Sequence, residues 1–87
     1  MKQANLSQIK ESIQDTVRKS ALGNRLKDVT LEADHDDFGS DFLRVLVEID
    51  SFEGVTDENM EALTASIENT VSDLDERFPS VRFADAA

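Results

Sequence analysis

The spacing of apolar residues changes from three or four to two near residue 26, and this change limits the folds that the chain can adopt. Between residues 5 and 22 the apolar positions recur every three or four residues, which predicts a helix with one buried stripe. Asn5 can cap the start of this helix, and Gly23 can end it in a left-handed conformation. The stripe consists of Leu6, Ile9, Ile13, Val17 and Ala21.

Two segments follow, residues 26–34 and 42–50, in which apolar residues recur at every second position. In a strand, alternate side chains point to opposite faces, so each run predicts a strand with one buried face. A polar, glycine-containing segment joins the runs, which predicts an antiparallel hairpin. In the second run the buried face would hold Leu43, Val45, Val47 and Ile49, and the opposite face Phe42, Arg44, Leu46 and Glu48.

A second helix is predicted from the cap residue Thr56 until Pro79, with Phe78 as the last member of its apolar stripe. Val81 and Phe83 then predict a short final strand. The order helix, strand, strand, helix, strand favours an α+β two-layer sandwich, with two helices on one face of a three-stranded mixed sheet. We expect a single domain over residues 1–87, frayed at 1–4 and 84–87.

The charge of the chain is large and unevenly distributed. The 87 residues carry a net charge of −10. Residues 1–27 hold six basic and two acidic side chains, whereas residues 28–87 hold three basic and seventeen acidic ones. The excess of negative charge in residues 28–87 repels nucleic acids and anionic membranes, so we expect neither as a partner. The acidity favours either a basic protein partner or simple solubility, and the sequence leaves both open.

Neither a disulfide nor a membrane anchor is indicated by the sequence. It contains no cysteine and no apolar run of the length that crosses a bilayer. The N-terminal residues also lack the apolar run of a signal peptide. We therefore expect a cytoplasmic protein.

The predicted sandwich leaves one face of the sheet uncovered. That face would carry Phe42, Arg44, Leu46 and Glu48, and two large apolar residues on an exposed strand face indicate a contact surface for a partner protein or a second copy. The alternative is that long arginine side chains merely shield Phe42 and Leu46.

Residues 34–41, with the sequence DHDDFGSD, contain four carboxylates and the single histidine, His35. The segment fails as an EF-hand because Phe38 and Val45 occupy positions that need oxygen ligands. One histidine without cysteine does not complete a tight transition-metal site within one chain, although a dimer would supply a second His35. We interpret the segment as an exposed hairpin loop. We expect no metal, no cofactor and no catalytic residue, and hence no enzyme.

Two resemblances add to this interpretation. The segment DHDDFGSDFLRVLVEID, followed by a long helix and the ending ERFPSVRFADAA, resembles short uncharacterised bacterial proteins that accompany toxin–antitoxin or nucleotidyltransferase-type operons. That resemblance implies protein binding, as an inhibitor, an antitoxin-like partner or a regulatory subunit. The element order and the ending RFPSV are also similar to the cytoplasmic domain of cation diffusion facilitators, which implies a dimeric metal-responsive domain as the alternative. Of that family's several histidines only His35 has a counterpart here.

Overall fold

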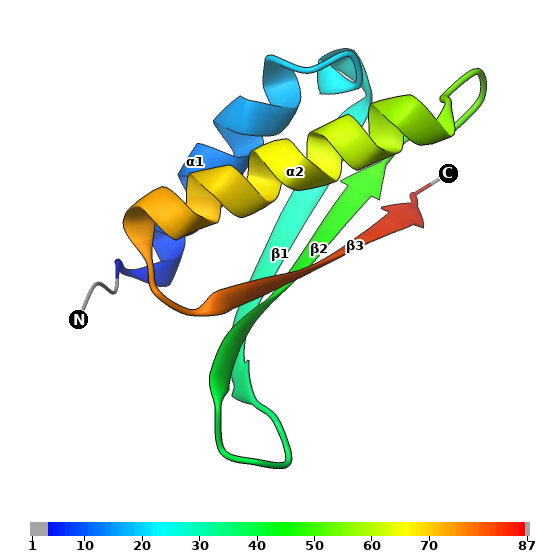
Figure 1. Ribbon diagram of the computed structural model, residues 1–87. Coiled ribbons are helices and arrows are strands. Elements are labelled where there is room, and N and C mark those ends of the chain that lie inside the picture. Colours follow the sequence, from blue (N-terminus) through cyan, green and yellow to red (C-terminus); the bar gives the residue numbers. More distant parts are fainter. Residues whose placement is uncertain (1–3, 87) are drawn as a thin grey trace.

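The computed structural model describes residues 4–86 and shows two helices packed on one face of a three-stranded sheet (Figure 1). The predicted α-β-β-α-β order and the mixed sheet are confirmed. The elements are α1 (Leu6–Arg18), the short 3-10 helix η1 (Gly23–Arg25), β1 (Leu26–His35), β2 (Asp41–Ile49), α2 (Asp57–Leu74) and β3 (Phe78–Asp85).

Strand β2 lies in the centre of the sheet, antiparallel to β1 and parallel to β3. Its residue Val45 is opposite Leu31 on one side and Val81 on the other. Every second residue of β2, from Leu43 to Ile49, is completely buried beneath the helices. The core is therefore a single layer between the helices and one face of the sheet. Its fully or almost fully buried apolar members are Ile9, Ile13, Val17, Leu22, Val29, Leu43, Val45, Val47, Ile49, Leu63, Ile67 and Val71.

Both predicted helix starts are confirmed by their hydrogen bonds. The Asn5 side chain accepts a hydrogen bond of 2.8 Å from the backbone N–H of Gln8. The Thr56 hydroxyl accepts one of 3.1 Å from the backbone N–H of Asn59. Each bond satisfies a donor that has no partner within its own helix, so these caps fix where the two helices begin.

The end predicted for the first helix is wrong, because α1 stops at Arg18 instead of Leu22. The hydroxyl of Ser20 donates a 2.6 Å hydrogen bond to the carbonyl oxygen of Val17 and turns the chain away from the helix. Gly23 begins η1 and has no left-handed backbone. Its lack of a side chain still matters, because a Cβ at this position would collide with the backbone of Arg18.

The second helix ends at Leu74, earlier than Pro79 suggested. Asp75 is already extended, with φ of −150° and ψ of 146°. Phe78 belongs to β3, so its predicted place in the helical stripe is wrong. Strand β3 also includes Ala84 and Asp85, which were expected in a frayed tail. Of the predicted frayed ends, residues 1–3 and 87 lie outside the described residues.

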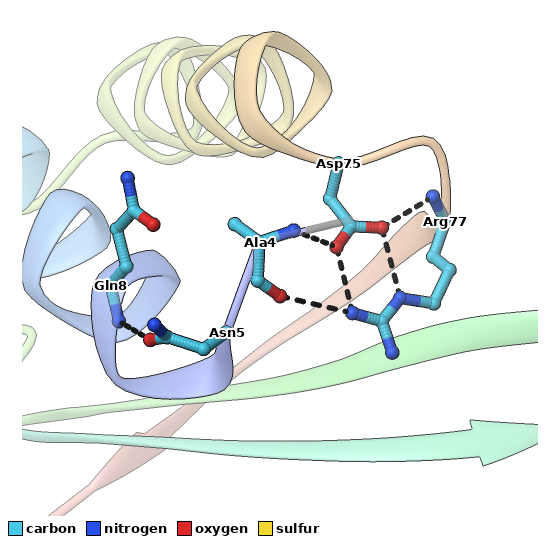
Figure 2. Close-up of polar contacts among 5 residues, drawn as sticks. All are labelled: Ala4, Asn5, Gln8, Asp75 and Arg77. Carbon is cyan, nitrogen blue, oxygen red and sulfur yellow. Dashed lines mark hydrogen bonds and ion pairs between the residues drawn. The ribbon is translucent and has the colours of Figure 1, made fainter. Parts of the chain in front are cut away.

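Asp75, the residue directly after α2, has the one buried charged side chain among residues 4–86 (Figure 2). Its carboxylate accepts hydrogen bonds of 2.7 and 2.9 Å from the Arg77 guanidinium and one of 3.1 Å from the backbone N–H of Ala4. The Arg77 guanidinium also donates a 3.5 Å hydrogen bond to the Ala4 carbonyl oxygen. These bonds connect the segment before α1 to the turn between α2 and β3.

The Arg77 hydrogen bonds hold the pKa of Asp75 below its ordinary value of 3.8, although burial of the carboxyl acts in the opposite direction. As the pH falls below 3.8, the unfolded chain takes up a proton at Asp75 before the folded chain does. The stabilisation by this pair is therefore present above that pH and is lost as the pH falls through the lowered folded pKa.

We expect Asp75→Asn to lower the free energy of unfolding at neutral pH by about 3 kcal/mol, because it leaves the Arg77 guanidinium, which is 14% exposed, without its carboxylate. Urea unfolding followed by circular dichroism measures this difference. It should shrink as the pH is lowered below 3.8, where wild type loses the same stabilisation.

Asp73→Asn is the matched control, since Asp73 is an exposed carboxylate two residues earlier, in the last turn of α2. It should change the free energy of unfolding by less than about 0.5 kcal/mol. If the two variants are equally stable at every pH, the Asp75–Arg77 pair does not stabilise the fold.

Candidate functional site

The face of the sheet opposite the helices is uncovered and carries the whole set of residues predicted for partner binding. Residues opposite one another in adjacent strands point to the same side of a sheet. The register places Phe42 between Asp34 and Phe78, and Leu46 between Thr30 and Arg82. We call this surface the open face. It consists of Asp28, Thr30, Glu32 and Asp34 of β1, Phe42, Arg44, Leu46 and Glu48 of β2, and Phe78, Ser80, Arg82 and Ala84 of β3.

Three large apolar side chains lie on the open face. Phe42 and Leu46 are partly buried, whereas 66% of the Phe78 surface is exposed. Phe78 was missed as a site residue because its spacing continues the stripe of α2. From Phe78 onwards the side chains alternate, so that Phe78, Ser80 and Arg82 share one side while Pro79 and Val81 share the other. This period of two would have indicated that Phe78 lies in a strand.

Arg44 occupies the middle of the open face and is held by two acids of β1. Its guanidinium lies 2.9 Å from the Asp34 carboxylate and 3.8 Å from that of Glu32. It also lies 5.6 Å from the centre of the Phe42 ring. This contact is a cation–π interaction that covers part of the ring. Arginine shielding, the alternative considered from the sequence, is therefore present at Phe42.

The charged residues of the open face differ between its two outer strands. Strand β1 contributes Asp28, Glu32 and Asp34 and no cation. Strand β3 contributes Arg82, whose guanidinium makes no ion pair or hydrogen bond with any residue between 4 and 86. The backbone N–H of His35 and then Arg44 hold the pKa of Asp34 below its ordinary value. The acids of the β1 side are each paired, Asp28 with Lys10 of α1 at 3.7 Å and the other two with Arg44, whereas the β3 side carries one cation, Arg82.

The hairpin loop holds the other residues that suggested chemistry. His35 is opposite Asp41, next to an open hollow of about 210 Å³ that Ala33, Asp34 and Arg77 also line. This volume is below the usual range of ligand pockets, about 300–1,000 Å³. Arg77 is bound to Asp75, and Asp34 is bound to Arg44. In the described part of the chain no group of three or more potential ligands is placed to hold a metal ion.

The loop itself is organised by Asp36. Its carboxylate accepts hydrogen bonds of 2.9 Å from the backbone N–H groups of both Phe38 and Ser40. Gly39 follows with a φ of +81°, a conformation that glycine adopts without strain. Phe38 at the tip is 95% exposed. This side chain–backbone pattern is that of a tight polar turn.

Comparison of the chain with protein-family models, with curated proteins and with solved structures finds no match. Neither helix of residues 4–86 has both the length and the apolar composition needed to cross a bilayer.

We expect Asp36→Ala to lower the free energy of unfolding by about 1 kcal/mol, because two backbone donors of the turn lose their acceptor. Asp37→Ala is the control, since the neighbouring carboxylate accepts no hydrogen bond from residues 4–86. It should change the stability by less than about 0.5 kcal/mol. Urea unfolding of both variants measures the difference, and equal losses would contradict the role given to Asp36.

Proposed function

We propose that this chain acts in the cytoplasm by binding another protein through the open face, as an inhibitor, an antitoxin-like partner or a regulatory subunit. The observation that carries the proposal is a sheet face bearing Phe42, Leu46 and Phe78 that neither helix covers. Exposed apolar residues grouped on one face and surrounded by polar ones are typical of protein contact sites.

The charges of the chain favour a partner with basic groups. The side of the open face formed by β1 carries Asp28, Glu32 and Asp34, and residues 28–87 contain seventeen acidic side chains. A partner with an apolar centre and a Lys- or Arg-containing border would complement this surface. Such charges would mainly accelerate association and orient the partner. The resemblance to bacterial operon partners implies the same kind of function.

The test is affinity capture from the cells of origin with wild type and two matched variants, at low and at high salt. Leu46→Lys places a charge in the centre of the open face. Ala65→Lys places the same charge on the exposed side of α2. We expect a basic protein to be captured by wild type and by Ala65→Lys but not by Leu46→Lys, and less of it at high salt because salt screens the attraction.

The fold of Leu46→Lys is checked by circular dichroism before capture, since Leu46 is partly buried. Capture of the same proteins by both variants would contradict the assignment of the open face. Absence of any basic protein at low salt would contradict the proposed partner.

A further inference from the structure

Strand β1 is an outer strand of the sheet, and two hydrogen bonds of β2 show which of its backbone groups point outwards. The N–H of Asp50 donates to the carbonyl oxygen of Arg25, on the β1 side. The carbonyl oxygen of Ile49 accepts from the N–H of Ala86, on the β3 side. Because backbone groups alternate in direction along a strand, the even-numbered residues of β1 and β2 bond one another. The odd-numbered residues of β1 therefore direct their N–H and C=O groups away from the sheet.

Two of these outward N–H groups are covered by carboxylates of the same strand. The side chain of Asp28 accepts a 2.8 Å hydrogen bond from the N–H of Val29. The side chain of Asp34 accepts one of 2.8 Å from the N–H of His35. An N–H group that is bonded in this way is not free to bond another strand, so the outer edge of β1 is capped near both of its ends.

Cations hold both capping carboxylates in place. The Arg44 guanidinium lies 2.9 Å from the carboxylate of Asp34, and the Lys10 ammonium lies 3.7 Å from that of Asp28. Lys10 belongs to α1, which packs on the other face of the sheet, so its ion pair with Asp28 passes over the edge of β1. Between the two caps, the outward N–H groups are those of Leu31 and Ala33, and neither has a side-chain acceptor among residues 4–86.

The edge of β1 needs such closure more than the edge of β3. An uncovered edge pairs readily with the edge of another chain, and proteins block it with charges, bulges or prolines. In β3 the odd-numbered Pro79 lies where the backbone points outwards, so this edge lacks one donor. Strand β1 has ten residues and no proline, and its only irregularity is a shift of register near Lys27.

We propose that Asp28 and Asp34 close the outer edge of β1 to the addition of another strand, and so prevent copies of this chain from pairing edge to edge. Antiparallel pairing of two β1 strands centred on Leu31 would break both caps. It would also place Asp28 opposite Asp34 of the second copy, and like charges directly opposite each other are destabilising. The inference concerns the edge of the sheet and not the open face, so it does not depend on the proposed function.

Sedimentation equilibrium of a double variant tests the role of the two carboxylates. Asp28→Ala, Asp34→Ala removes both acceptors. We expect its self-association to be at least about tenfold stronger than that of wild type, measured between about 10 µM and about 1 mM protein. Strand addition would bond the free N–H groups of the edge. In hydrogen exchange followed by NMR, the amides of Leu31 and Ala33 in this variant should therefore exchange more slowly as its concentration rises.

Two control variants separate capping from charge. Asp28→Asn, Asp34→Asn loses the same charges and ion pairs but keeps side-chain oxygens that accept the N–H hydrogen bonds. Glu61→Ala, Asp73→Ala loses two charges on exposed residues of α2. We expect the self-association of both controls to stay within about threefold of wild type at about 0.15 M salt, where long-range repulsion is screened.

Three results would overturn the proposal. The first is a folded Asp28→Ala, Asp34→Ala variant that associates no more strongly than wild type. The second is a control variant that associates as strongly as this alanine variant. The third is association that leaves the exchange of the Leu31 and Ala33 amides unchanged, because the contact would then lie elsewhere.

The wild-type chain decides the question if the alanine variant does not fold. At low protein concentration, the capped amides of Val29 and His35 should exchange at least about fivefold more slowly than those of Leu31 and Ala33, after correction for neighbouring side chains. Equal exchange of the four amides would show that the carboxylates do not cover the edge, and the proposal would fail.

Discussion

The fold depends on the burial of one face of β2. The helices cover Leu43, Val45, Val47 and Ile49 completely, and these four residues join the stripes of both helices into one core. Because side chains alternate along a strand, the same burial places Phe42, Arg44, Leu46 and Glu48 on the opposite side. A shift of the register by one residue would exchange the two sets and expose the core. The open face is thus a direct consequence of the packing that stabilises the domain.

The second feature that shapes the molecule is the buried carboxylate of Asp75. It ends α2, binds the backbone of Ala4 and accepts two hydrogen bonds from the Arg77 guanidinium. The chain can therefore leave the helix early, and Phe78 enters β3 beside Phe42. The turn that connects the two layers thus also adds the most exposed of the three apolar side chains to the open face.

The sequence predicted the fold well because its patterns are local and strong. The change of spacing near residue 26 and the caps at Asn5 and Thr56 were sufficient for the element order and the mixed sheet. The end of α2 was not predictable in the same way. Asp75 resembles its exposed acidic neighbours Asp73 and Glu76 in the sequence, and it is distinguished by its hydrogen bonds to Arg77 and to residue 4, which is far away in the sequence. The position of Phe78 depended on that end, so this member of the open face was missed.

The central claim is that the open face, and not the helical layer, is the surface that this protein uses for contact. Methyl NMR during titration with the captured basic protein tests it within one strand, since Leu46 lies on the open face and Val45 beneath the helices. We predict that the methyl signals of Leu46 shift as the partner is added while those of Val45 stay in place. Constant Leu46 signals, together with shifts confined to residues of α1 and α2, would contradict the account.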